Sequence, residues 1–170
     1  MREADPGFKS SVLFISCEMQ NEELGQRAVA EGSGIAYQEM TTGRIDKDEF
    51  QRLFLAQRAL HNVPVAFIAQ SGLRIGRIRS AIRRHQRRYG LCLVIIDYIG
   101  LLKGDGVYRA GNKVAELSDI TEALKGMAKQ FQVPVLALAQ LNRDLAKRED
   151  KRPQLHDLRD SGSLEQDADE

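Results

Sequence analysis

The sequence predicts an α/β fold built on a mainly parallel sheet. Four short apolar runs typical of buried strands alternate with longer segments that have helical periodicity. These runs cover residues 12–16, 63–69, 91–97 and 133–140. Strands that alternate with helices imply right-handed crossovers, so the strands run parallel and their carboxyl ends meet at one edge, where such sheets bind ligands. With 170 residues, 42% of them hydrophobic, the chain can bury one sizeable core.

The first two helices are expected between the first and second apolar runs. Asn21 can cap the first, which has two acidic residues in its first turn and ends near Gly32 and Gly34. TTGRID then forms a turn. Asp46 can cap the second helix, with Glu49 three residues later as in a capping box. Its apolar stripe is Phe50, Leu53, Phe54 and Leu60, and Pro64 stops it.

Two further helices precede the third and fourth strands. The first follows SGLR, and Tyr89-Gly90 ends it. The second is a long amphipathic helix that follows the glycine-rich loop KGDGVYRAGN. The inward-facing residues are Ile75, Ile78 and Ile82 in the first, and Val114, Leu117, Ile120, Leu124, Met127 and Phe131 in the second.

Composition and the termini limit the protein class. Residues 1–10 read as a loose tail before a domain over residues 11–170, and residues 141–165 read as a polar functional loop with a turn at Ser161-Gly162-Ser163. Cys17 and Cys92 lie in or beside apolar runs, which favours buried thiols in a reducing compartment. No apolar run approaches the roughly 20 residues that span a bilayer, so we expect a cytoplasmic protein without a membrane partner. The net charge of +1 says little about partners.

Polar side chains follow three of the predicted strands. Glu18, Asp97 and Gln140 would emerge at the same edge of a parallel sheet. Each alone could be a solvated loop residue, a helix cap or a partner for a stray backbone group, at about even odds. Together they can surround a hydrated divalent cation, a polarised water molecule and a phosphate.

Asp97 follows four apolar residues, which is the Walker B pattern. In that pattern the carboxylate holds the water shell of Mg²⁺ beside nucleotide phosphates. Glu18 could then be the base that deprotonates the attacking water, and Gln140 could contact that water or the phosphate.

Five segments resemble the RecA-type motor domain of DnaB-family replicative DNA helicases, in order and from about residue 11 onward. The most specific is DKRP followed by DLRxSGxxEQDAD, and the Walker B pattern alone would be weak. The resemblance implies a RecA-like P-loop NTPase fold and a homo-hexamer that uses ATP and Mg²⁺ to translocate on single-stranded DNA and unwind the replication fork. Primase and a loader are the implied replication partners. The segments are SVLFISCEM, SGLRIGRIRSAIRRHQRRYG, LVIIDYIGLL, VAELSDITEALKGMAKQFQVPVLALAQLNR and DKRPQLHDLRDSGSLEQDAD.

The resemblance also implies roles for individual residues. Glu18 matches the catalytic glutamate, Asp97 the Walker B aspartate and Gln140 the glutamine that couples nucleotide to DNA. The loop that touches the DNA backbone matches Arg159, Asp160 and Gly162. This chain departs from the family at two positions: it has Asp160 where glutamate is usual and Gly100 where glutamine is frequent.

Two basic segments have different interpretations. Residues 74–88 hold seven arginines around an apolar stripe, and a solvated or subunit-facing surface is favoured there over DNA contact. Lys147, Arg148, Lys151 and Arg152 precede the Arg159 loop in a segment with no core to build, so phosphate contact is favoured for them.

The sequence contains no phosphate-binding Gly-x-x-x-x-Gly-Lys-Ser/Thr motif. The family has this loop before the matched segments and an arginine finger after them, so we expect a partial RecA-like domain whose strand ending at Gln140 lies at a sheet edge. Two alternatives stay open. A RecA-type recombination or repair ATPase would share Glu18, Asp97 and Gln140 but not the DKRP to EQDAD run. An interaction module without turnover would fit the missing motif.

Overall fold

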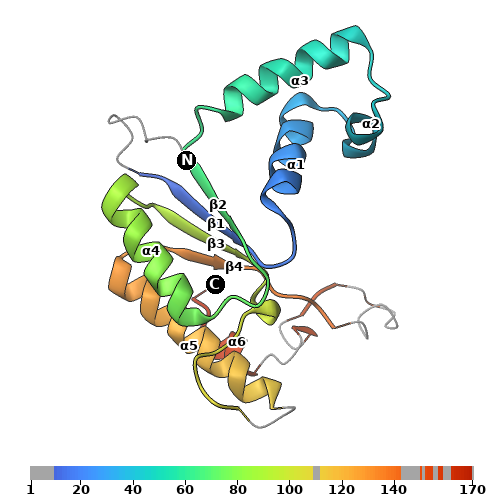
Figure 1. The fold of residues 1–170 in the computed structure, drawn as a ribbon. Helices are drawn as coiled ribbons and strands as arrows, with labels where there is room; N and C mark the ends of the chain where they lie inside the picture. Colours follow the sequence, from blue (N-terminus) through green and yellow to red (C-terminus); the bar gives the residue numbers. More distant parts are fainter. Residues whose placement is uncertain are drawn as a thin grey trace.

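A four-stranded parallel sheet forms the centre of the fold (Figure 1). The computed structural model describes residues 10–108, 112–142, 150, 152–154, 157–158 and 162–169. The strands lie in the order β2-β1-β3-β4, which confirms the predicted parallel α/β class. They are β1 (Val12–Ser16), β2 (Val65–Ala69), β3 (Leu93–Asp97) and β4 (Val135–Ala137).

The register of the sheet aligns the carboxyl ends of its central strands. Ser16 at the end of β1 pairs with Ala69 on one side and with Asp97 on the other. Valine, isoleucine, leucine and phenylalanine fill most strand positions, and their stiff or bulky side chains suit a pleated surface covered on at least one face.

Two long helices cover one face of the sheet. These are α4 (Ile75–Tyr89) and α5 (Lys113–Phe131), which lie side by side in Figure 1. Alternate strand residues such as Ile15 and Ile96 point at them and are fully buried. The predicted inward residues of both helices are confirmed except for Val114, which is exposed in the first turn of α5. The core contains Leu13, Ile15, Ile75, Ile78, Ile82, Val94, Ile96, Leu117, Ile120, Leu124, Met127 and Phe131.

Three helices connect β1 to β2, where the sequence predicted two. They are α1 (Asn21–Ser33), the unpredicted short α2 (Tyr37–Thr42) and α3 (Lys47–Leu60). The Asp46–Glu49 capping box at α3 is confirmed. The cap predicted at Asn21 was wrong: Gln20 is the N-cap of α1, without a side-chain hydrogen bond, and Asn21 is the first helical residue.

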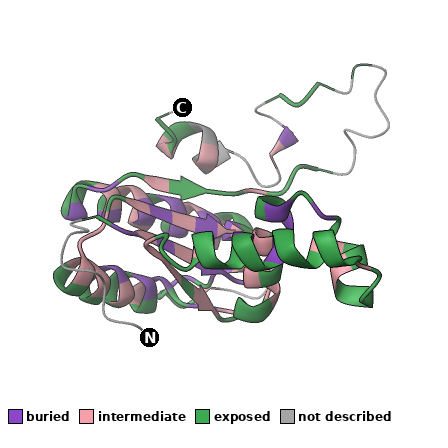
Figure 2. Ribbon diagram, turned by 90° about the horizontal axis from the view of Figure 1, so that it is seen from above, coloured by how far each residue is buried: buried purple, intermediate pink, exposed green. Residues whose placement is uncertain are grey.

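The outer surface of α3 is largely exposed (Figure 2). Leu53 and Ala56 are buried against α1, and a Cβ at Gly32 would lie 3.5 Å from Ala56 Cβ, so the two helices approach closely. Phe50 and Phe54 belong to the predicted apolar stripe of this helix but are 63% and 51% exposed. A helical period places apolar residues on one side of a helix but does not say that another element covers that side.

The last strand is shorter than predicted and lies at the edge of the sheet. β4 has three residues and begins after Pro134, which has no N–H to donate to the ladder, and after Gln132, which has a positive φ of 54° at the end of α5. Leu136 and Leu138 are 50% and 41% exposed. The predicted edge position of this strand is confirmed for the residues that the structure describes.

Two short elements complete the fold. A 3-10 helix, η1 (Ile99–Leu101), follows β3, and α6 (Gly162–Asp167) packs on α5. The sequence placed a turn at Ser161-Gly162-Ser163, but Gly162 and Ser163 belong to α6. In the described part of the chain, no helix combines the length and the apolar character needed to cross a membrane.

Candidate active site

The carboxyl edge of the sheet brings Glu18 and Asp97 to adjacent strands. The Cys17 N–H donates to the Asp97 carbonyl oxygen at 2.7 Å, which extends the β1–β3 pairing one residue past the end of β1. Glu18 is the next residue and is exposed. The Met19 N–H donates to Ser16 Oγ at 2.9 Å, so a local turn holds the segment that carries Glu18.

Asp97 lies on the face of the sheet opposite α4 and α5. Val94 and Ile96 are fully buried beneath these helices, and side chains alternate along a strand, so the Asp97 side chain projects to the other face. It is partly exposed there. The carboxylate is therefore open to a ligand that approaches this face.

Strand order makes this edge a ligand-binding position. The chain passes from β1 outward to β2 and then returns across β1 to β3, so the direction of winding reverses between β1 and β3. In open α/β sheets the crevice at such a switch point takes the ligand. Glu18 and Asp97 follow the two strands that flank it.

Gln140 lies at the same edge, beyond β4. The Leu138 N–H donates to the Ile96 carbonyl oxygen at 2.9 Å, and the Ile99 N–H donates to the Leu138 carbonyl oxygen at 3.0 Å. These bonds fix the chain two residues before Gln140 against the segment that carries Asp97. The edge therefore gathers all three predicted residues.

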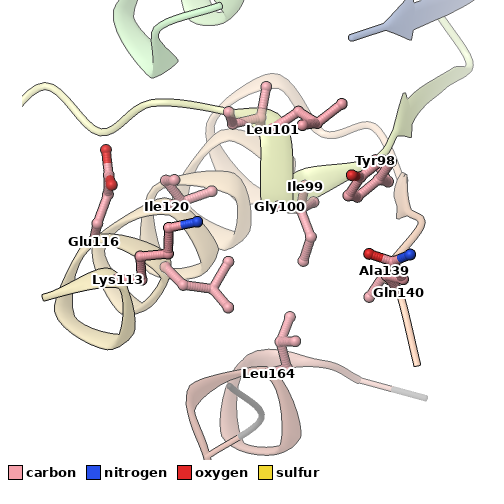
Figure 3. A pocket seen from close by; sticks show the side chains of 12 residues that line it. Tyr98, Ile99, Gly100, Leu101, Lys113, Glu116, Ile120, Ala139, Gln140 and Leu164 are labelled. Carbon is pink, nitrogen blue, oxygen red and sulfur yellow. The ribbon is translucent and has the colours of Figure 1, made fainter. Parts of the chain in front are cut away.

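A cavity of about 180 Å³ lies beside Gln140 (Figure 3). In Figure 3, Tyr98 and Gln140 line one side of it, Lys113 and Glu116 of α5 line the opposite side, and Leu164 of α6 lies below. The remaining lining includes apolar side chains of η1 and α5. A Cβ at Gly100 would lie 3.1 Å from Tyr98 Cε2, so the glycine found here leaves room for the Tyr98 ring.

The cysteine next to Glu18 at this edge, Cys17, does not have a reactive thiol. Burial raises the pKa of the Cys17 thiol, and the negative charge of Asp97 raises it further. Cys17 therefore stays neutral at pH 7 and acts as a buried packing residue, as predicted. Cys92, predicted to be buried, is exposed.

The donor set at the edge suits Mg²⁺ held largely by water. Among the described residues, no group of three or more histidine, cysteine, aspartate or glutamate side chains could cage a metal ion. Mg²⁺ keeps several water ligands and commonly uses one or two carboxylates together with substrate phosphates. Asp97, partly exposed on an open face, can supply such a carboxylate.

Backbone contacts join the residues just after Gln140 to residues 157 and 158. Leu141 and Leu158 form an antiparallel β-bridge, and the Asn142 N–H donates to the Asp157 carbonyl oxygen at 2.6 Å. Asp157 is buried, and its carboxylate accepts from the Gln154 N–H at 2.8 Å. The bridge thus joins the residue after Gln140 to the residue before Arg159 in the sequence.

The predicted DNA-contacting residues fall partly outside the described residues. Arg152 is described and exposed, whereas the other basic residues and the loop residues before Gly162 lie outside the described residues: Lys147, Arg148, Lys151, Arg159 and Asp160. Gly162 is the first residue of α6.

The sequence did not predict what holds α6 in place. Thr121 Oγ1 on α5 donates to Asp167 Oδ2 at 2.5 Å, and the Lys125 ammonium pairs with the Asp169 carboxylate and lowers the pKa of that carboxyl. Leu164 packs against the core between these contacts and the cavity. A signal existed, because Thr121 is a polar residue beside the apolar stripe of α5 and both aspartates belong to the EQDAD run.

Replacing Thr121 with valine should loosen α6. The variant keeps the shape of the side chain but leaves Asp167 without its hydroxyl donor, and a hydrogen bond to a charged group contributes about 1.5–3 kcal/mol. Amide hydrogen exchange in α6 should therefore accelerate while exchange in β1 and β3 stays unchanged. Thr121→Ser restores the hydroxyl and should restore protection; equal exchange in the two variants would show that the bond does not hold the helix.

The fold and its acidic edge define a class. A parallel sheet in this order, with carboxylates at its switch point, has the RecA-like fold. Residues 2–170 match the model of the DnaB-like helicase C terminal domain, and the chain belongs to that family.

Similar proteins agree in both sequence and structure. The chain is 42% identical to the replicative DNA helicase DnaB of Rickettsia bellii and 38% identical to the replicative DNA helicase DnaC of Bacillus subtilis, each over 159 residues. These matches cover 94% of this chain but 32% and 35% of those proteins, so the chain spans about a third of their length.

Two solved structures are similar to the chain with a TM-score of 0.86 and 33% identity, and each comparison covers 94% of this chain. One is a DnaB-like replicative helicase described with its interactions with primase, of which 39% is covered. The other is described as an ATPase domain, of which 57% is covered.

Proposed function

We propose that this domain hydrolyses ATP with Mg²⁺ as part of a replicative helicase motor that translocates on single-stranded DNA and unwinds duplex at the fork. The observation that carries the proposal is the placement of Glu18 and Asp97 on adjacent strands at the switch point of the sheet. Membership of the DnaB-like helicase family and the likeness to a solved ATPase domain support it.

The geometry suggests how the edge residues divide the work. Asp97 would hold the water shell of Mg²⁺, which neutralises charge on the nucleotide phosphates. Glu18, exposed two residues beyond the end of the neighbouring strand, would orient the attacking water and take its proton. Gln140 would contact that water or the terminal phosphate.

DNA contact is proposed for residues 141–165. Arg159, Asp160 and Gly162 would contact the phosphate backbone, partly through main-chain groups, and Lys151 and Arg152 would add positive charge. The Leu141–Leu158 bridge supports coupling of this segment to the nucleotide, because it connects the sequence neighbours of Gln140 and Arg159. A change at one end of the bridge would therefore reach the other.

The assembled motor is proposed to be a homo-hexamer with replication partners. A DnaB-like helicase similar to this chain has a structure that describes its interactions with primase. We extend that partner, together with a loader, to the protein that carries this domain. The recombination-ATPase alternative is less supported, because the resemblance includes the DKRP to EQDAD run and the matching relatives are replicative helicases.

Replacing Arg159 with alanine in the complete protein should weaken single-stranded DNA binding about equally for all base sequences. One phosphate contact is lost, so the slope of log affinity against log salt should fall by about 0.7 on single-stranded DNA. Fluorescence anisotropy with oligonucleotides of different sequence measures both quantities.

The matched control for this variant is Arg44→Ala, which changes an exposed arginine in the turn before α3. It should leave both the affinity and the salt slope unchanged. A loss confined to one base sequence in Arg159→Ala would contradict the assignment of a backbone contact.

A further inference from the structure

The stretch between Glu49 and Asp97 contains no acidic residue. Nine arginines lie in it, and most of them are concentrated on α4. The whole chain carries a net charge of only +1, so the rest of the chain is net negative. Positive charge is therefore gathered on one helix. We call the following residues the α4 arginine face: Arg77, Arg79, Arg83, Arg84, Arg87 and Arg88.

Every side chain of the α4 arginine face is exposed. The opposite side of the helix packs into the core through Ile75, Ile78 and Ile82, so the arginines lie on its outer half. The face runs from Arg77 to Arg88 along this helix, a length of about 17 Å. In Figure 1, α4 lies beside α5 on one face of the sheet.

No carboxylate of the described residues forms an ion pair with the α4 arginine face. The acidic group that approaches the helix is Asp105, whose carboxylate would lie 2.9 Å from a Cβ at Gly76 in the first turn. That carboxylate sits at the helix N-terminus, where it complements the macrodipole. The outer half of α4 is left without neutralising partners in the part of the chain that the structure describes.

Other exposed helices of this chain are built differently. In α1, Arg27 pairs with Glu23 at 3.0 Å, and in α3, Arg52 pairs with Glu49 at 3.7 Å. Such mixed charges are typical of a solvated face. On α4 the i,i+4 neighbours repel each other instead, which costs a few tenths of a kcal/mol per pair. The repelling pairs are Arg79–Arg83, Arg83–Arg87 and Arg84–Arg88.

A surface that only needs solvation does not explain this arrangement. Seven cations run from Arg74 to Arg88, and none is a lysine. The planar guanidinium fork binds phosphate oxygens in pairs, whereas lysine serves as a hydrated point charge. The Tyr89 ring is already covered, because His85 and the Arg88 guanidinium lie 5.0 Å and 5.2 Å from its centroid. Phosphate groups are therefore better ligands for this face than stacked bases.

We propose that the α4 arginine face is a second DNA-binding surface, which takes the phosphate backbone independently of residues 141–165. From the sequence alone, a solvated or subunit-facing surface was favoured for this helix over DNA contact, and the proposal departs from that expectation. The proposal rests on the proposed function in one respect: the phosphate-bearing ligand of α4 is taken to be DNA. Binding there is sequence-independent and salt-dependent, because phosphates alone are contacted.

The test neutralises Arg83 and Arg87 with glutamine in the complete protein. Glutamine has a helix propensity close to that of arginine, and the change removes a repelling pair, so the melting temperature should stay equal or rise. Affinity for a duplex oligonucleotide should fall, and its salt slope should drop by roughly 1–2, since each phosphate contact contributes about 0.9. Arg44→Gln/Arg58→Gln, which neutralises two exposed arginines outside α4, should change neither quantity.

The same pair of substitutions in an Arg159→Ala background separates this surface from the proposed DNA loop. The double change should lower the residual affinity further by the same factor as in the parent protein. A failure of the Arg159 prediction alone would leave this result intact. An unchanged salt slope in Arg83→Gln/Arg87→Gln would overturn the proposal. If that slope stayed unchanged while size-exclusion chromatography showed weaker subunit assembly, α4 would instead face an acidic protein surface.

Discussion

Replacing Glu18 with glutamine in the complete protein should preserve nucleotide binding and abolish most ATP turnover. Glutamine keeps the size of the side chain and can still orient water, but it cannot accept the proton. General base catalysis contributes typically 10²–10⁴-fold, so the steady-state rate should fall by roughly that factor. The dissociation constant of a fluorescent ATP analogue should stay within about twofold, because the Asp97 site is untouched.

Glu22→Gln provides the matched control for this prediction. It makes the same chemical change on an exposed residue in the first turn of α1. Turnover should remain close to that of the parent protein. Loss of ATP binding in Glu18→Gln, in place of loss of turnover, would assign Glu18 to nucleotide or metal retention and would contradict its role as a base.

The 170-residue chain alone should hydrolyse ATP at least roughly 10³-fold more slowly than a protein that also carries a phosphate-binding loop. Phosphoryl transfer depends on positioning and charge stabilisation, and no Gly-x-x-x-x-Gly-Lys-Ser/Thr motif is present to supply the amides and the lysine. Weak self-association should accompany inactivity, because β4 exposes Leu136 and Leu138 at the sheet edge. Analytical ultracentrifugation measures that second effect.

The comparison needs the longer protein in the same steady-state assay, with and without single-stranded DNA. If the 170-residue chain and the longer protein turned over ATP at comparable rates, residues that we interpret as a loop would have to bind the phosphates. Residues 103–106 would be the first candidates. Their present contacts argue for a structural role, because the Gly104 N–H donates to Glu116 and its carbonyl oxygen accepts from Arg74.

Local patterns were sufficient to predict the sheet and the two covering helices. The strand runs, the inward isoleucines of α4 and the capping box at α3 each depend on residues close together in the sequence. Such signals are physical properties of one segment. The same segments could not reveal that Phe50 and Phe54 remain exposed, because that depends on which other element covers α3.

The candidate site was partly predictable for a similar reason. Parallel topology alone requires Glu18, Asp97 and Gln140 to share an edge once each follows a strand. The contact between Thr121 and Asp167 joins residues 46 positions apart, and no periodicity links them. The Leu141–Leu158 bridge likewise brings together two leucines that lie in a polar segment with no strand pattern.

The pairing of β1 also determines the order in which the domain can fold. Val12 has Val65 as its partner on one side and Leu93 on the other, so this central strand can pair only with segments far along the chain. Non-local parallel pairing is slow, because the entropy of closing the intervening loop is lost before contacts form. During synthesis, β1 therefore stays unpaired on both sides until Ala69 has left the ribosome, and its second side stays unpaired until Asp97 follows. A chaperone that binds short extended apolar peptides would be expected to recognise it in that interval.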